Sequence, residues 1–307
     1  MKHIKKSFPS PNNKAKIVSI AVSLVILVCI LAFMPEYLKD YGKPGYIPEA
    51  SENLFSVHYI DVGQGDSSLL CSPKGEFMLI DCGPSGSKEK LISYLYRMDV
   101  EELEYLVVTH PHEDHYGGVT EVMDEFKVKN LILHKDFADF YPYDKFIRNA
   151  KKDGTKVLLT TEGDKFTFDG CAYFEIIGPH FVDENDLNES SLCFKVTYGD
   201  TAFLFTGDAE YDAEKYMLDS GKDLKADVFQ LGHHGSSTSN TNAFVEAVDP
   251  VYGIASCEKN NDYGHPHRET VGLFKKLEKE LLITYRDGDI VFTSDGEKVT
   301  LVSGSHS

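Results

Sequence analysis

The feature that most constrains this chain is a stretch at residues 109–118 in which metal-ligand side chains follow directly on an apolar run. The apolar run, Leu103 to Val108, is short and rich in residues that favour strands, which predicts a buried strand. We therefore expect the stretch on the loop that joins the end of this strand to a helix. Its ligand-type side chains fall within six residues and are His110, His112, Asp114 and His115.

The mixture of imidazole and carboxylate groups in this loop indicates which ions it would hold. Such donors suit Zn²⁺, Mn²⁺ or iron and disfavour Ca²⁺ or Mg²⁺ alone. Because side chains alternate along an extended chain, His110 and His112 are expected on one side, and Asp114 and His115 can face a second ion. The glycines at 117 and 118 are expected to let the chain bend tightly. The alternative is a surface loop that is histidine-rich by chance, which four ligand types at one strand end argue against.

Two later strand ends carry the same residue types. Asp208 follows Gly207 and an apolar run at 202–205, and the pair His233 and His234 follows another run at 228–231. Taken singly, the aspartate reads as an ordinary turn residue and the histidine pair as a helix cap or a core contact. Three strand ends with ligand side chains are better explained by one convergent site.

The first forty residues differ sharply in composition from the rest. Lysines precede an uninterrupted run of apolar or small residues at 17–34, which as a helix would span about 27 Å, close to the thickness of a bilayer core. The run ends without a clean pair of small residues for signal cleavage, so we expect an uncleaved single-pass anchor in the cell membrane, with cleavage and secretion as the alternative. Residues 1–16 would lie in the cytoplasm, residues 35–53 would form a tether, and the catalytic domain would be extracellular.

Net charge limits the partners of the exported part. The whole chain carries −18, and residues 1–40 contribute +4 (six lysines against Glu36 and Asp40), so the remainder carries −22. A surface this acidic repels nucleic acid unless a local basic patch or a bound metal overrides the repulsion. No cluster of lysine or arginine lies near the ligand motifs.

Strand-like and helix-like runs alternate along the domain expected at residues 54–303. The expected strands cover residues 54–60, 68–71, 77–80, 103–108, 130–133, 156–159, 173–177, 192–198, 202–205, 228–231, 251–255, 282–285 and 290–293. The expected helices cover residues 88–98, 119–126, 143–150, 211–218, 240–248 and 269–280. Many short strands interleaved with amphipathic helices predict an α/β (α+β) domain in which two sheets pack face to face with helices outside.

Further motifs accompany the first loop in a fixed order along the chain. They are Ile60 to Ser67, Asp81 to Gly83, Asn188 to Leu192, His233 to Ser236 and Tyr263 to Pro266. With the pattern H-x-H-x-D-H at 110–115, the chain resembles the metallo-β-lactamase superfamily, and within it the C-terminal domain of ComEC-type competence DNA-uptake proteins. The resemblance covers roughly residues 54–300 and implies an αββα sandwich with its metals along one edge. It also implies a metal-dependent nuclease, although phosphorylcholine esterases of cell-wall teichoic acid share similar motifs.

The resemblance further implies two divalent ions, Zn²⁺ or Mn²⁺, that share Asp208. Most of the superfamily has a histidine before the strand at 192–198, but this chain has Leu187, Asn188 and Glu189 there. Either one metal is lost or another histidine replaces this missing ligand, and His265 is the candidate. The expected ligands are His110, His112 and His234 for one ion, and Asp114, His115 and His265 for the other. The roles of His233 and His234 could be exchanged.

Two cations that share a carboxylate would lower the pKa of a water between them and generate hydroxide for attack on a phosphodiester. Asp114 and Asp208 would hold these ions, while His233 would contact the phosphoryl oxygen or protonate the leaving group. Asp81 would orient a ligand imidazole, with a structural turn as the alternative. The residues expected at the mouth of the site, with a glycine-rich turn as the alternative, are Gln64 and Asp66.

Three functions fit these motifs. The first is a membrane-anchored extracellular hydrolase that cuts DNA or another phosphodiester polymer. The second is a hydrolase of small or cell-wall-linked phosphoesters, which an acidic surface tolerates, and only the first predicts a steep salt dependence. The third is a non-catalytic binding domain, against which the ligand set argues. A β-lactamase or thioesterase role is disfavoured because the usual histidine near residue 188 is absent.

Overall fold

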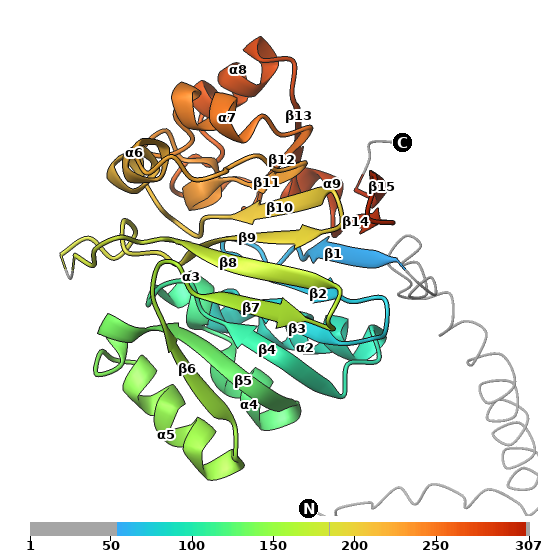
Figure 1. Ribbon diagram of the computed structural model, residues 1–307, viewed down its shortest axis with the longest axis vertical. Coiled ribbons are helices and arrows are strands. Elements are labelled where there is room, and N and C mark those ends of the chain that lie inside the picture. The colour runs from blue at the N-terminus through green and yellow to red at the C-terminus, as the bar shows by residue number, and fades with distance from the viewer. Residues whose placement is uncertain (1–53, 184, 305–307) are drawn as a thin grey trace, which may run out of the picture. The chain divides into compact units, whose positions relative to one another are not determined.

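The computed structural model describes residues 54–183 and 185–304, which form two β-sheets with helices beside them (Figure 1). The predicted anchor at 17–34 and the predicted tether at 35–53 lie outside the described residues. Within the part of the chain that is described, no helix is both long and apolar enough to cross a membrane.

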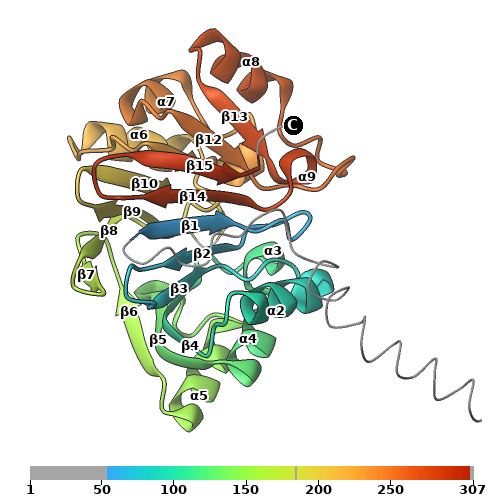
Figure 2. The same cartoon turned by 90° about the vertical axis from the view of Figure 1, so that its right-hand side faces the viewer.

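The first sheet has eight strands in the order β15-β14-β1-β2-β3-β4-β5-β6. Strands β3 to β6 run parallel to one another, whereas β1 is antiparallel to both β2 and β14. The C-terminal strands therefore lie beside the first strand of the domain (Figure 2). The strands of this sheet are β1 (Phe55–Tyr59), β2 (Ser68–Cys71), β3 (Phe77–Ile80), β4 (Glu102–Val107), β5 (Lys127–His134), β6 (Lys156–Thr160), β14 (Ile290–Ser294) and β15 (Val299–Ser303).

The second sheet has seven strands in the order β13-β12-β11-β10-β9-β8-β7. Strands β7 to β10 form an antiparallel meander, and β10 to β13 run parallel. Its strands are β7 (Lys165–Phe168), β8 (Ala172–Gly178), β9 (Cys193–Tyr198), β10 (Thr201–Phe205), β11 (Val228–Gln230), β12 (Tyr252–Ala255) and β13 (Glu280–Ile283).

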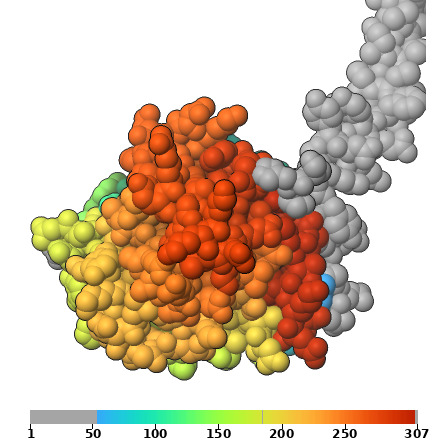
Figure 3. Space-filling model, turned by 90° about the horizontal axis from the view of Figure 1, so that it is seen from above, coloured from blue at the N-terminus to red at the C-terminus, as the bar shows by residue number. Residues whose placement is uncertain are grey.

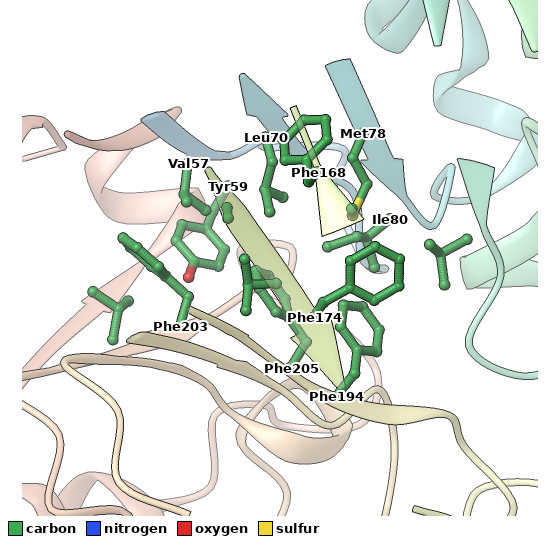
Figure 4. Close-up of a cluster of buried hydrophobic side chains, with 14 of the residues drawn as sticks. Val57, Tyr59, Leu70, Met78, Ile80, Phe168, Phe174, Phe194, Phe203 and Phe205 are labelled. Atoms are coloured by element: carbon green, nitrogen blue, oxygen red, sulfur yellow. The ribbon is translucent and has the colours of Figure 1, made fainter. Parts of the chain in front are cut away.

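The main core lies between the two sheets and is rich in aromatic side chains (Figure 4). Tyr59 of β1 stacks on Phe205 of β10 with ring centroids 5.9 Å apart, and Phe205 stacks in turn on Phe194 at 5.3 Å. Each of these rings is fully or almost fully buried. Burying one such side chain contributes about 1.5–3 kcal/mol, so this layer holds the sheets together.

Helices cover the outer faces of both sheets, which confirms the predicted two-sheet α/β fold. In the second sheet, Leu204 and Phe229 pack on their outer side against Met217, Phe244 and Phe274 of three helices. These helices form much of the orange-to-red face in Figure 3. On the first sheet, α4 contacts β5 and α5 contacts β6. The helices are α2 (Lys88–Arg97), α3 (Glu113–Tyr116), α4 (Val119–Glu125), α5 (Tyr143–Asp153), α6 (Tyr211–Asp219), α7 (Asn242–Val248), α8 (Arg268–Lys276) and α9 (Thr284–Asp287).

Most predicted elements are present, but several details differ. The helix predicted at 269–280 ends at Lys276, because Glu280 begins β13 and pairs with Tyr252. Tyr285, predicted in a strand, lies in α9. Strands β7 and β15 were not predicted; each is the outermost strand of its sheet and buries few side chains, so its hydrophobic pattern is weak.

Strand direction brings the predicted site residues to one edge. Strands β1, β3 and β4 run the same way, and their carboxyl ends lead into residues 64–66, Asp81 and the loop at 109–118. In the second sheet, parallel strands β10, β11 and β12 end before Asp208, the histidine pair and the segment with His265. Polar side chains that follow strands can face a shared site without disturbing the apolar layer between the sheets.

Candidate metal centre

The loop after β4 packs tightly against the segment that follows β3. Gly117 has an ordinary helical φ of −54°, so backbone freedom is not what requires glycine there. A Cβ at this position would lie 2.2 Å from the backbone nitrogen of Ser85, and one at Gly118 would lie 2.6 Å from the carbonyl oxygen of Cys82. The two glycines therefore permit close approach of two loops, rather than the tight bend expected from the sequence.

The histidine pair after β11 lies in a short 3₁₀ turn, Gly232–Gly235, with φ values of 49° at His233 and 55° at His234. Left-handed backbone costs roughly 1–2 kcal/mol per non-glycine residue, so this turn needs support. Asn240 provides it: its Oδ1 accepts the N–H of Gly232 at 3.0 Å, and its Nδ2 donates to the carbonyls of Gly232 at 2.9 Å and Ser236 at 3.1 Å. Strain held in this way is typical of functional sites.

Asp208 lies between two groups of ligand-type side chains and turns one oxygen to each. Its Oδ2 is 3.8 Å from Nε2 of His110 and 3.8 Å from Nε2 of His233. Its Oδ1 is 3.2 Å from Nε2 of His115 and 3.6 Å from Nε2 of His234. This is the arrangement expected of a carboxylate that two cations share.

The other members of each group lie close to these atoms. Nδ1 of His112 is 3.0 Å from Nε2 of His110. On the other side, Nε2 of His234 is 3.1 Å from Oδ2 of Asp114, and its Nδ1 is 3.4 Å from Oδ1 of Asp66. Ligand atoms lie within 4.8 Å of one another in two sets, one from Asp66, His115, Asp208 and His234, the other from His110, His112 and Asp208.

Asp81 contacts the imidazole of His115 on the side away from Asp208, as expected for a residue that orients a ligand imidazole. Its Oδ2 accepts a hydrogen bond from Nδ1 of His115 at 2.8 Å and another from the hydroxyl of Thr109 at 2.7 Å. Its Oδ1 accepts the backbone N–H of Thr109 at 2.8 Å. These bonds place the proton of a neutral His115 on Nδ1 and leave Nε2 facing Asp208.

Unpaired atoms and buried charge at this site both fit divalent cations. Among the described residues, Nε2 of His115 and Oδ1 of Asp208 are buried and face each other at 3.2 Å without a well-formed hydrogen bond. A buried polar atom left unpaired costs about 1–3 kcal/mol unless a ligand satisfies it. Burial by itself would lower the pKa of His115 and His234, but nearby carboxylates, Asp208 first, raise both pKa values well above the ordinary value. The carboxylates thus favour positive charge here, which bound cations would supply.

The positions of the histidines change the sharing predicted from the sequence. His234 lies beside Asp114 and His115, not beside His110 and His112. His233 instead approaches the oxygen of Asp208 that faces His110.

His265 belongs to neither ligand set found among the described residues. Its ring centroid lies 5.2 Å from that of His233 and 5.9 Å from that of His234. Burial, together with the neighbouring histidines, lowers the pKa of His265 to about 4. The predicted grouping of His265 with Asp114 and His115 is not found among the described residues, where His265 lies beside His233 and His234 instead.

A cavity of about 270 Å³ opens over these side chains. Gln64 lines it, as expected for the mouth, with its Nε2 3.5 Å from Nδ1 of His265. Asp66 was expected beside Gln64 but is buried beneath, and both its carboxylate oxygens lack a hydrogen-bond partner within the described part of the chain. Its backbone N–H donates to the carbonyl of Asp114 at 3.2 Å, which draws the residue inward.

Two residues at the site were missed by sequence reasoning. Glu210 accepts a hydrogen bond from Nδ1 of His233 at 2.8 Å and another from the hydroxyl of Thr238 at 2.8 Å. The available signal was a second carboxylate two positions after Asp208. Tyr263 lines the cavity with an exposed ring, and its signal was an aromatic residue within the motif that contains His265.

The amino-acid sequence of this chain is similar to a known protein family and to individual known proteins. Residues 60–258 match the profile described as the Metallo-beta-lactamase superfamily. ComE operon protein 3 of Bacillus subtilis (strain 168) is 30% identical over 254 residues, covering 77% of this chain and 32% of the relative. Competence protein ComA of Neisseria gonorrhoeae is also 30% identical over 254 residues, covering 82% of this chain and 34% of that protein. The chain thus spans about a third of the length of these relatives.

A solved structure supports the same fold. Igni18, a novel metallo hydrolase from the hyperthermophilic archaeon Ignicoccus hospitalis, aligns with a TM-score of 0.51 and 16% sequence identity, covering 77% of this chain and 98% of that one. At this identity the likeness concerns the fold alone.

Proposed function

Because this chain belongs to the metallo-β-lactamase superfamily, we propose that it is a metal-dependent phosphodiesterase that cleaves DNA or another nucleic acid outside the cell. The superfamily fold and the buried histidine–aspartate cluster support a metal-dependent hydrolase. The extension to nucleic acid draws on a relative named as a competence protein. The extracellular, membrane-anchored location rests on the lysines and the apolar run at 17–34.

One observation carries the proposal: Asp208 presents its two carboxylate oxygens to two separate sets of nitrogen and oxygen ligands. His110 and His112 would hold one cation and His115 and His234 would hold the other, with Asp208 shared. His233, whose Nε2 is 3.8 Å from Oδ2 of Asp208, would complete the first set, and Asp114, whose Oδ2 is 3.1 Å from Nε2 of His234, would complete the second. Cations bound in this way supply Lewis acidity that activates a water and stabilises negative charge on a phosphoryl oxygen.

The residues around these ligands fix their orientation. Asp81 holds His115 through Nδ1, and Glu210 holds His233 through Nδ1, so each imidazole presents Nε2 to Asp208. Asp66 lies beside Nδ1 of His234 in the same way. With Nε2 turned towards Asp208, His233 is better placed to bind a cation than to protonate a leaving group, the role first expected for it.

The test is hydrolysis of bis(p-nitrophenyl) phosphate by the full-length chain in detergent, reconstituted with Mn²⁺ or Zn²⁺. Asp208→Asn removes the shared carboxylate and is expected to abolish turnover. Asp227→Asn is the matched control, because Asp227 lies at the opposite end of the same sheet, where its carboxylate accepts the N–H of Ala202. No turnover by the parent chain with metal demonstrably bound would refute phosphodiesterase chemistry.

A second candidate substrate is a small or cell-wall-linked phosphoester, favoured by the chain's net charge of −18. Among the described residues, none that lines the cavity over the metal-ligand side chains is a lysine or arginine that could offset that charge. Cleavage of a DNA strand should weaken steeply as salt rises, because phosphate contacts release counterions. The rates of cleavage of DNA and of bis(p-nitrophenyl) phosphate, measured between about 50 and 200 mM salt, distinguish the two candidate substrates. A rate of DNA cleavage that does not change with salt would favour the small substrate.

A further inference from the structure

An exposed tyrosine stands at the mouth of the metal-ligand cavity without a structural reason for its exposure. Tyr263 keeps 66% of its surface accessible to solvent although it lines the same cavity as Asp208 and His233. We propose that Tyr263, backed by His265, is a stacking platform for a nucleobase of the substrate. This inference rests on the proposed phosphodiesterase function and names the part of the substrate that the site recognises.

The geometry of the two rings is that of a stack with one face left open. The ring centroids of Tyr263 and His265 are 5.6 Å apart, and their planes differ by 19°. His265 is 93% buried, so its ring is a fixed base on which the tyrosine rests. Aromatic rings stack well in this offset, near-parallel arrangement, and a further flat ring can extend the stack on the exposed side.

The loop that carries Tyr263 is held in place by Asn261. Its Oδ1 accepts the N–H of Tyr263 at 3.2 Å and the N–H of His265 at 2.9 Å. Its Nδ2 donates to the carbonyl of His265 at 2.7 Å. Both residues of the platform are therefore positioned before any substrate arrives, which lowers the entropy cost of binding.

His267 ties this loop to the turn that carries the histidine pair. Its Nδ1 accepts the N–H of Ser237 at 2.9 Å, so in the neutral ring Nε2 bears the proton and donates to the carbonyl of Tyr263 at 3.0 Å. The platform and the metal-ligand turn thus form one connected unit, and the ring of His265 lies 5.2 Å from that of His233. A base stacked on Tyr263 would bring its own sugar and phosphate to the cavity that Tyr263 and Asp208 both line.

The shape of the platform favours a flat ring over a quaternary ammonium group. A cationic head group such as choline is usually held by several aromatic faces that surround it. Here His265 stacks nearly parallel to Tyr263, so the two rings offer one outer face and no cage. Base stacking is also an interaction that can supply affinity here, since the described residues that line the cavity include no lysine or arginine.

The experiment compares two oligonucleotides that differ only in their bases. One is a fluorescein-labelled oligothymidylate, and the other has the same length and charge but carries abasic tetrahydrofuran residues throughout. Binding is measured by fluorescence anisotropy with the full-length chain in the Asp208→Asn background without added metal, so that neither oligonucleotide is cut. We expect the base-bearing strand to bind roughly tenfold more tightly, in line with one stacked base.

Variants assign this preference to the platform. Tyr263→Ala should reduce affinity for oligothymidylate roughly tenfold and leave the abasic strand unaffected, whereas Tyr263→Phe should retain the preference because it keeps the ring. Tyr173→Ala is the matched control: Tyr173 is another exposed tyrosine, 46% accessible, near the start of β8 and outside the residues that line the cavity.

The possible results separate this inference from the proposed function. Equal affinity for the two strands, including no measurable binding of either, would overturn the platform, as would an unchanged preference in Tyr263→Ala. Competition by phosphorylcholine that depends on Tyr263, without any preference for bases, would replace the nucleobase by a quaternary ammonium ligand and also overturn it. Failure of the chain with intact Asp208 to hydrolyse bis(p-nitrophenyl) phosphate would refute the proposed function. The difference in affinity between the two oligonucleotides would still test whether Tyr263 is a stacking platform.

Discussion

At the scale of single residues, each ligand-type imidazole depends on the group behind it. Glu210 is one such group: its hydrogen bond to His233 lowers the pKa of the Glu210 carboxyl, so the carboxylate is the form that holds the ring. The oxygen that receives Nδ1 of His233 also accepts the hydroxyl of Thr238. Glu210 therefore orients the ring of His233 through Nδ1, while Nε2 of the same ring faces Asp208.

Replacing Glu210 by alanine should weaken metal binding without unfolding the domain. The ring of His233 would lose its partner at Nδ1, and loss of such a partner typically lowers metal affinity by about 10–100-fold. Competition between the full-length chain and a chelating dye for Zn²⁺ or Mn²⁺ measures the effect. Glu210→Gln, whose amide oxygen can still accept from Nδ1, should recover most of the affinity, and Glu246→Ala, on the exposed face of α7, is the control. Unchanged affinity in Glu210→Ala would show that His233 is not a ligand.

At the scale of elements, helix α6 supports the turn with the histidine pair through Glu214. This buried side chain accepts the N–H groups of Asn240 and Thr241, where α7 begins. Asn240 in turn holds both ends of the turn through Gly232 and Ser236. A contact between two helices on the outer face of the sheet thus maintains backbone strain at the metal centre.

Glu214 should make the domain less stable as pH rises. Burial raises its pKa from 4.5 to about 7, so the folded chain binds more protons than the unfolded chain between these values. The contribution of Glu214 to stability is therefore fully present below pH 4.5 and is lost as pH rises through about 7, a change of about 3 kcal/mol.

Urea unfolding of the parent chain and Glu214→Gln at pH 5 and pH 8 measures this contribution. The variant should lose a smaller share of its free energy of unfolding between the two pH values, because glutamine does not titrate. Glu246→Gln, on the exposed side of α7, should behave like the parent. Parallel pH profiles for the parent and Glu214→Gln would mean that Glu214 is already ionised at pH 5.

At the scale of the whole molecule, the metal-ligand residues join the two sheets. His115 and Asp114 follow a strand of the first sheet, while Asp208 and His234 follow strands of the second. A cation bound between them would link both layers at their common edge, in addition to the aromatic core that already holds them.

Metal binding should therefore raise the thermal stability of the domain. A ligand that binds only the folded state at 100 times its dissociation constant contributes about 2.7 kcal/mol. We expect Mn²⁺ or Zn²⁺ to raise the melting temperature of the parent chain and of Asp227→Asn, and EDTA to reverse the rise. Asp208→Asn should respond far less; an equal response in this variant would place the binding of metal elsewhere on the chain.

The fold class and most of the residues that gather at the site could be predicted from the amino-acid sequence. Periodicity located the main strands, and ligand residues directly after strands such as 103–108 and 202–205 had to meet at an edge, because the space between two packed sheets is apolar. The absence of the usual histidine near Asn188 was also visible, and so was the histidine pair that lies beside Asp208.

Which ligand residue faces which oxygen of Asp208 could not be predicted, because it depends on long-range contacts. The left-handed turn at His233 and His234 points the two side chains in directions that neither a helical nor a strand period predicts. The burial of Asp66 and the partnership of Glu210 with His233 depend on contacts between distant loops. Local pattern fixes which face of an element is apolar, but it does not fix the path of a loop, whose conformation is set by the long-range contacts it makes.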